Sequence, residues 1–221
     1  MTSPAGSGAA TAIMRLRIAL FGVKPTVWRR IEVAVTATLA DLHAAIQAAM
    51  GWEDLHLHCF RILGRQYDPE HRTEVRLADL RLRAGERFSY VYNHTAPWEH
   101  VLRVEGIGPG RPGLRYPRCV AGQHGCPPEW CPGPEAYEEI KAELLGLSYA
   151  EDLQLLAEFG RAVLAARDGM VRDALDAVDA DELEGALRRH KRREALIEPF
   201  DRRRANTTLG LLATASAGAT P

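Results

Sequence analysis

The stretch Met14-Arg-Leu-Arg-Ile-Ala-Leu-Phe21 decides the fold, because apolar residues alternate there with polar or small ones. This period of two is typical of a β-strand with one buried face. Residues 27–35 repeat the pattern with aromatic and β-branched side chains, and residues 22–25 predict a turn between the two strands. The chain therefore begins its folded part with paired strands.

Working outward from these strands, Thr38 is expected to cap a helix over residues 39–50. A third strand is predicted over 57–63, and a hairpin has its arms at 88–93 and 98–105. After a cysteine-containing loop the period becomes helical, and the predicted helices span residues 135–145, 149–167, 170–178 and 180–193. Strands first and helices last predict an α+β fold. It has an antiparallel or mixed sheet with one early helix, followed by the cysteine-containing loop and C-terminal helices.

The 221 residues are 46% hydrophobic, enough to bury a sizeable core. We expect a disordered leader over 1–12, a single α+β domain over 13–204 and a disordered tail over 205–221. Within the domain, residues 13–134 form the predicted sheet-rich core and residues 135–204 the helical region. Residues 1–11 do not have a basic start typical of a secretory signal, and no apolar run approaches the ~18 residues of a membrane span. A cytoplasmic location without membrane contact is therefore expected.

Three cysteines, Cys119, Cys126 and Cys131, fall within thirteen residues of a proline-rich stretch. Thiolates this close can converge on one metal ion, and a closed zinc site takes four Cys or His ligands. His100 is the predicted fourth ligand, because alternation places it on the apolar face of its strand. His124 and Cys59 are the rival ligands. The alternative to a zinc site is that all four cysteines are unliganded and partly buried.

The histidines permit a second interpretation. His56, His58 and His100, together with Glu99 and Glu129, could form an acid–base or metal cluster. A cysteine nucleophile paired with one of these histidines would be its simplest form, so the alternative function is a thiol- or metal-dependent hydrolase. Taken singly, each histidine is better explained as a half-buried core residue that hydrogen-bonds to the backbone. The sequence does not decide whether the chain is an enzyme.

The basic residues concentrate near the C-terminus. The segment 188–204 holds 8 basic and 3 acidic side chains, and it could bind a protein partner or the phosphates of a nucleic acid. A solvated helix end that complements the acidic segment before it explains the same pattern.

Several motifs occur in an order that is similar to a known family. They are Lys24-Pro25, Trp28-Arg29-Arg30, Leu42-His43, Ile46-Gln47, Gly51-Trp52, His56-Leu57-His58, Tyr90-Val91-Tyr92, Trp98-Glu99-His100, Tyr116-Pro117, Cys119, Cys126-Pro127-Pro128-Glu129 and Cys131. Over residues 14–145 they resemble the plasmid pRiA4b ORF-3-like family. The resemblance implies an α+β fold and an origin on plasmids or as a passenger of insertion elements, without an established activity. We therefore expect an accessory or interaction module associated with mobile DNA, with a structural zinc site.

The chain departs from the family pattern at two places. Residues 93–96 are Asn-His-Thr-Ala, where the family usually has an acidic, glycine-containing turn. Trp130 stands after Glu129, where the family usually has aspartate. Carboxylates are thus missing from one predicted cleft, which argues against acid-dependent chemistry or the binding of a hard cation there.

Overall fold

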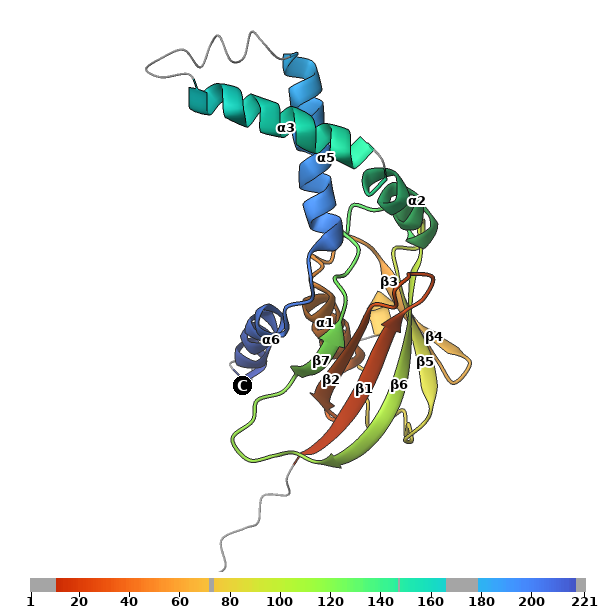
Figure 1. Cartoon of the computed structure of the whole chain (residues 1–221). Coiled ribbons are helices and arrows are strands. Elements are labelled where there is room, and N and C mark those ends of the chain that lie inside the picture. Colours follow the sequence, from red (N-terminus) through yellow and green to blue (C-terminus); the bar gives the residue numbers. More distant parts are fainter. Residues whose placement is uncertain (1–10, 72–73, 147, 166–178, 218–221) are drawn as a thin grey trace, which may run out of the picture. The chain divides into compact units, whose positions relative to one another are not determined.

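The computed structural model describes residues 11–71, 74–146, 148–165 and 179–217 (Figure 1). Its strands are β1 (Ala12–Leu20), β2 (Trp28–Ala34), β3 (His58–Ile62), β4 (Arg65–Tyr67), β5 (Arg87–Tyr92), β6 (Trp98–Pro109) and β7 (Arg118–Gln123). Its helices are α1 (Leu39–Met50), α2 (Pro134–Leu144), α3 (Ser148–Ala165), α5 (Ala180–Ile197) and α6 (Arg202–Ala217). The predicted helix over 170–178 lies outside the described residues. No helix within these ranges has the length and apolar character needed to cross a membrane.

The strands form one sheet in the order β4-β3-β5-β6-β1-β2-β7. Each pair of neighbours is antiparallel. Together with the early helix and the C-terminal helices, this confirms the predicted α+β fold. The short strand β4 was not predicted, and residues 118–123 form β7 beside β2 where the sequence predicted a loop.

The chain separates into two compact units. The first comprises residues 1–134 and 199–221, and the second comprises residues 135–198. In the second unit Asp152 accepts hydrogen bonds from Arg189 and Arg193, and Arg193 also donates to the carbonyl of Leu144. These two ion pairs and the hydrogen bond to Leu144 connect the three helices α2, α3 and α5.

Alternation along the strands separates the two faces of the sheet in the first unit. In β1 the inner residues Met14, Leu16, Ile18 and Leu20 are at most 2% exposed, as expected from the period of two. Helix α1 contributes Leu39, Leu42, Ala45, Ile46 and Ala49 to the same core. A capping box between Thr38 and Asp41 starts this helix, and Gly51 ends it in the left-handed conformation with a φ of 85°.

Helix α6 occupies residues Arg202–Ala217, which include most of the predicted disordered tail over 205–221, and residues 218–221 lie outside the described residues. Ala205 and Leu209 are buried where α6 packs against α1 and β7. The amide of Asn206 pairs with both backbone groups of Cys119: its Oδ1 accepts from the N–H at 2.9 Å and its Nδ2 donates to the carbonyl at 2.8 Å. A few small apolar residues therefore suffice, because the backbone of β7 supplies hydrogen bonds that sequence composition does not reveal.

Candidate metal centre

The site begins with two polar residues on the buried face of α1. His43 and Gln47 are four residues apart, so they lie one helical turn from each other. Both contact the hydroxyl of Tyr90 on the inner face of β5, with His43 Nδ1 at 2.9 Å and Gln47 Nε2 at 2.8 Å. The Tyr90 hydroxyl therefore fixes the orientation of the His43 ring through its Nδ1 atom.

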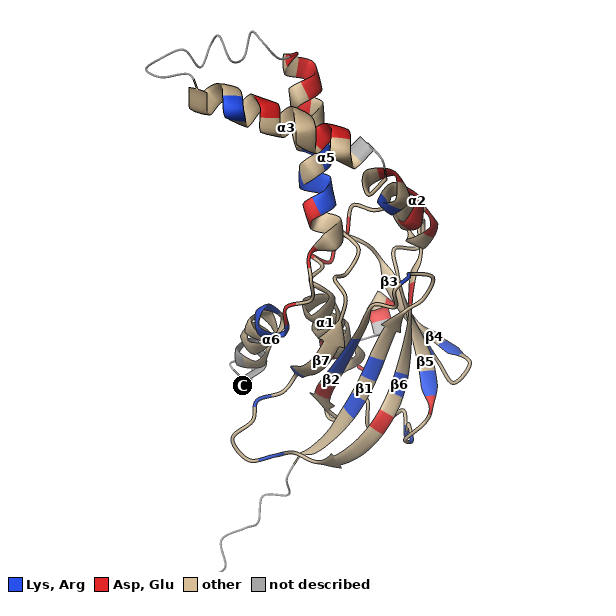
Figure 2. Cartoon of the chain, in the orientation of Figure 1, with Lys and Arg blue, Asp and Glu red and all other residues tan. Residues whose placement is uncertain are grey.

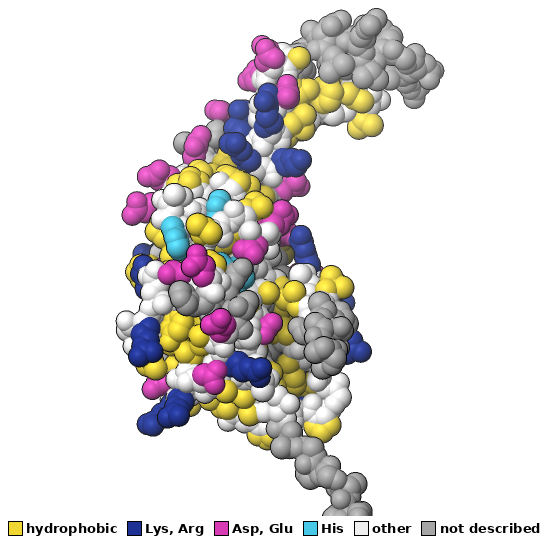
Figure 3. Space-filling model, turned by 180° about the vertical axis from the view of Figure 1, so that it is seen from behind, with side chains coloured by type: hydrophobic (Ala, Val, Ile, Leu, Met, Phe, Trp, Pro, Cys, Tyr) yellow, Lys and Arg dark blue, Asp and Glu magenta, His cyan; other side chains and the backbone are white. Residues whose placement is uncertain are grey.

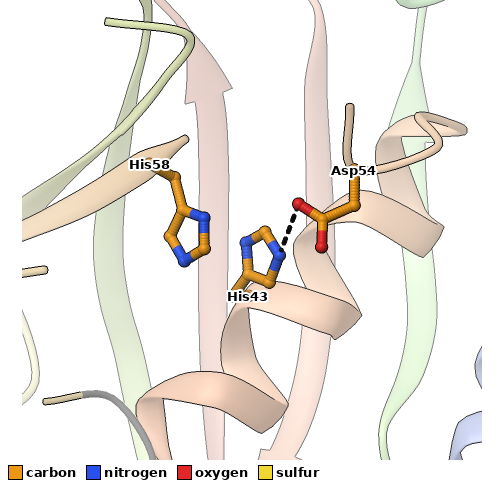
Figure 4. A group of neighbouring side chains, drawn as sticks. All are labelled: His43, Asp54 and His58. Atoms are coloured by element: carbon orange, nitrogen blue, oxygen red, sulfur yellow. Dashed lines mark ion pairs between the residues drawn. The ribbon is translucent and has the colours of Figure 1, made fainter. Parts of the chain in front are cut away.

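Two further residues bring ligand atoms to His43 (Figure 4). Asp54 lies in the loop after α1, and its Oδ1 is 3.0 Å from His43 Nε2. His58 begins β3, and its ring stacks on the His43 ring with centroids 3.6 Å apart. One ligand atom from each of His43, Asp54 and His58 lies within 4.8 Å of the other two. Two imidazoles and one carboxylate form a donor set that suits zinc and other divalent transition ions.

The loop that carries Asp54 is held by Glu129, from the proline-rich stretch. Its carboxylate accepts the backbone N–H of Glu53 at 2.6 Å and of Leu55 at 3.0 Å. It also accepts a hydrogen bond from the hydroxyl of Tyr92, which in turn accepts the N–H of His56 at 3.1 Å. These bonds clamp the backbone on both sides of Asp54, whose φ of 60° lies in the left-handed region. Aspartate tolerates that region better than most residues.

Burial determines the protonation state of the clamp. Burial and the neighbouring Glu129 carboxylate both raise the pKa of Tyr92. The phenol therefore keeps its proton at neutral pH and remains a donor to Glu129. As a result the carboxylate of Glu129 is occupied by three donors, and it serves as a support for the loop rather than as a free base.

The two stacked rings constrain the charge of the site. Two imidazolium ions at this distance would repel each other, so at least one of His43 and His58 is neutral while they stack. A neutral imidazole has one nitrogen that can bind a metal ion or accept a proton. If His43 Nε2 binds a metal, Nδ1 carries the proton and donates to Tyr90, a typical support for a metal-binding histidine.

The site is closed on one side and open on the other. The side chains of His43 and Asp54 are 5% and 48% exposed, respectively. Figure 3 shows the molecule from the side opposite to Figure 1, where histidine and acidic side chains reach the surface. An ion at this site would therefore be reached by solvent past Asp54, as in sites that keep an open coordination position.

The structure separates the predicted zinc ligands from this group. Cys119 is buried in β7, Cys126 and Cys131 follow in the loop after it, and His100 is fully buried on β6. Among the described residues, the group of ligand atoms within 4.8 Å is formed by His43, Asp54 and His58 and contains none of these four. All three cysteines are free thiols. A zinc ion at Cys119, Cys126, Cys131 and His100 stays a prediction.

The environment of these residues favours their neutral forms. Burial raises the pKa of Cys126 to about 12 and that of Cys131 to about 11. Burial lowers the pKa of His100 to about 4. Its ring packs edge-on against Trp52 with centroids 5.3 Å apart, and its Nδ1 lies 3.1 Å from the Trp98 carbonyl.

The predicted hydrolase cluster is distributed in a similar way. His58 belongs to the candidate metal centre, and Glu129 holds the loop of Asp54 beside it. The His56 ring packs against Tyr92 with centroids 5.5 Å apart. Glu99 lies on the outer face of β6, where its carbonyl accepts the N–H of Phe21 at 2.8 Å. Cys59 is on the face of β3 opposite to His58, as alternation requires.

Sequence reasoning found His58 but missed His43 and Asp54 as site residues. One local signal was present, namely the spacing of His43 and Gln47 on the buried side of a helix. Buried polar side chains need partners, so a histidine and a glutamine one turn apart in an apolar stripe indicate a polar network. Asp54 reaches the site because its backbone is in the left-handed conformation, which the local sequence does not predict.

Comparisons with known proteins agree with the fold. A family model described as plasmid pRiA4b ORF-3-like protein matches residues 12–157. The uncharacterized protein y4hQ of Sinorhizobium fredii (strain NBRC 101917 / NGR234) is 32% identical over 139 residues, which are 58% of this chain and 71% of that protein. The crystal structure of a protein of unknown function, MM3350 from Methanosarcina mazei Go1, matches with a TM-score of 0.54 and 27% identity. That match covers 78% of this chain and 92% of the other.

Proposed function

The chain belongs to the plasmid pRiA4b ORF-3-like family, and from its own site we propose that it binds a divalent transition-metal ion through His43, Asp54 and His58. The observation that carries this proposal is the convergence of three ligand atoms within 4.8 Å from three separate segments of the chain. Zinc is the first choice because it accepts imidazole and carboxylate together. The name of the family, a plasmid reading frame, supports the predicted role as an accessory module of mobile DNA.

The surroundings of the three ligands support this assignment. Tyr90 and Gln47 hold the His43 ring from the side away from Asp54. Glu129 holds the loop of Asp54 by two backbone hydrogen bonds. Such outer contacts orient ligands before the ion binds and reduce the entropy that binding costs.

A metal-dependent hydrolase is the second candidate, and one observation favours it. Asp54 is half exposed, so an ion held here keeps a coordination position on the solvent side. A metal-bound water at such a position ionises near neutral pH and can attack an ester or amide. The thiol-dependent form has less support, because burial raises the pKa of both Cys126 and Cys131.

Cobalt titration of the metal-free protein tests the proposal, because the cobalt spectrum reports the ligand type. We expect one equivalent to bind, with a visible ligand-field spectrum and no sulfur-to-metal charge-transfer band. Asp54→Asn should weaken binding about tenfold or more. The matched control His94→Gln changes an exposed histidine outside the site and should leave binding unchanged.

Two results would overturn the assignment. One is a metal-free protein that binds no cobalt with the three ligands intact. The other is a charge-transfer band that disappears in Cys126→Ser while Asp54→Asn binds normally. That result would place the ion at the cysteines and would instead support the zinc site predicted from the sequence.

A further inference from the structure

The outer face of the sheet carries arginines in an unusual arrangement. Strand pairing puts Arg17 of β1 opposite Arg30 of β2 and also opposite Arg103 of β6. Arg103 is in turn opposite Arg87 of β5. Four arginines therefore lie side by side across β2, β1, β6 and β5, and we call them the arginine row. With neighbouring strands ~4.8 Å apart, the row is about 14 Å long.

This row is costly for the folded protein. Like charges directly opposite each other destabilise a sheet. Part of the charge is compensated, because Arg30 binds the carboxylate of Glu105 at 2.5 and 2.8 Å. Arg17 lies over the ring of Trp28 at 5.1 Å. Arg87 and Arg103 are exposed, and within the described residues neither has an ion pair.

The rest of this face adds to the positive charge. Figure 2 shows where Lys and Arg occur along β1, β2, β5 and β6. By alternation, the outer positions of β1, β2, β3, β5 and β6 contain six arginines and three glutamates. The arginines are Arg15, Arg17, Arg30, Arg61, Arg87 and Arg103, and the glutamates are Glu32, Glu99 and Glu105. In the first unit the described helix α1 packs on the other face.

We propose that the arginine row binds the phosphate backbone of single-stranded nucleic acid. Guanidinium groups bind phosphates through two hydrogen bonds each, and a polyanion removes the repulsion between neighbouring arginines. Two aromatic residues lie near one end of the row. Trp28 pairs with Ala19, two residues beyond Arg17, and Phe21 follows β1 with 64% of its surface exposed. Basic residues beside aromatic side chains on an open sheet are typical of single-strand binding.

The test is fluorescence anisotropy with a labelled oligothymidylate of about 20 nucleotides, titrated at about 50 mM and about 200 mM salt. We expect Arg87→Gln with Arg103→Gln to weaken binding roughly tenfold at the lower salt, and to reduce the salt slope by about 1.4. Arg87→Lys with Arg103→Lys should retain most of that slope, because the charges remain.

A matched double variant on α5, Arg188→Gln with Arg192→Gln, removes the same charge from the basic segment 188–204. It should leave affinity for the oligonucleotide within about twofold of the unchanged protein. Circular dichroism and melting curves establish that each variant is folded. The exposure of Arg87 and Arg103 makes unfolding of the glutamine variants unexpected.

Three outcomes would overturn the proposal. The first is an unchanged affinity and salt slope in Arg87→Gln with Arg103→Gln. The second is a loss confined to the α5 variant, which would place binding at 188–204. The third is tighter binding of a duplex of the same length, or of polyglutamate, than of the single strand, which would identify a different occupant for the row.

Discussion

The imidazole rings of His43 and His58 lie parallel within 5°, with centroids 3.6 Å apart. Two protonated rings this close would repel each other, so at least one of them is neutral and has a nitrogen that can bind a metal ion. Asp54 at 3.0 Å from His43 provides the negative charge that such an ion requires. The nitrogen lone pairs of the two parallel rings lie in separate planes, so a shared metal ion requires one ring to turn out of the stack.

Zinc should raise the melting temperature of the wild-type protein. An ion that binds only the folded state stabilises it by about 2.7 kcal/mol at a concentration 100 times its dissociation constant. Asp54→Asn should remove most of this gain, and differential scanning fluorimetry with and without zinc measures it. An equal zinc-induced shift in wild type and Asp54→Asn would contradict a role for this carboxylate.

Glu129→Ala should weaken metal binding even though Glu129 contacts no ligand atom. The change removes the acceptor for the N–H groups of Glu53 and Leu55, so the loop of Asp54 loses its support. We expect a loss of about 10-fold to 100-fold in affinity, measured by competition with a coloured chelator.

The control for Glu129→Ala is Glu53→Ala, which removes an exposed carboxylate from the same loop. It should change the affinity little, because the Glu53 backbone N–H that Glu129 holds is still present. Equal losses in both variants would show that net charge near the site matters and that the clamp does not.

His100 should make the protein less stable at mildly acidic pH. Burial lowers its pKa from 6.5 to about 4 in the folded state, so the unfolded chain takes up a proton first as the pH falls. The stabilisation is therefore complete above pH 6.5 and is lost toward pH 4. Because of this residue, the free energy of unfolding measured with urea should be about 2 kcal/mol lower at pH 5 than at pH 7.

His100→Gln serves as the comparison, because glutamine cannot take up the proton. The pH-dependent part of the unfolding free energy between pH 7 and pH 5 should be smaller in this variant by the same amount. An identical pH dependence in both proteins would show that folding does not lower the pKa of His100.

The cysteines should react slowly in the native protein. Burial raises the pKa of Cys126 to about 12 and of Cys131 to about 11, so few thiolates exist at pH 8. A chromogenic disulfide should modify them far more slowly without urea than with it. Release of one equivalent of zinc as the thiols react would support the predicted site at Cys119, Cys126, Cys131 and His100.

Much of the fold could be predicted from local patterns. The alternation in β1 and the N-cap at Thr38 predict a strand and a helix from local sequence alone. The structure has β1 and α1 where the sequence predicts them. Strand β7 was missed because its residues, from Arg118 to Gln123, do not alternate clearly and are surrounded by glycine and proline. Its pairing with β2 is a contact distant in sequence, which local propensity cannot reveal.

The candidate site was predicted only in part for a similar reason. His58 lies on the face that alternation assigns to it, but its neighbours come from α1 and from the loop after it. Convergence of His43 and Asp54 requires the helix to pack on β3 and β5, and it requires Glu129 to hold the loop. Spacing along the chain directed the prediction to the cysteines instead, and a metal ion at those residues stays a prediction.

Replacing Arg103 by threonine should stabilise the folded protein while it weakens the arginine row. Arg103 lies between Arg17 and Arg87, so its removal relieves two cross-strand repulsions. The control Arg61→Thr gains the same β-propensity, but its partners across the strands are the uncharged Ser89 and Gln66. We expect the free energy of unfolding, measured with urea at low salt, to be about 0.5–1 kcal/mol higher for Arg103→Thr than for Arg61→Thr. High salt should shrink the difference, because screening weakens repulsion between exposed charges. Equal stability of the two variants at low salt would mean that the row costs the fold nothing. In that case repulsion between its arginines would no longer argue for an anionic ligand.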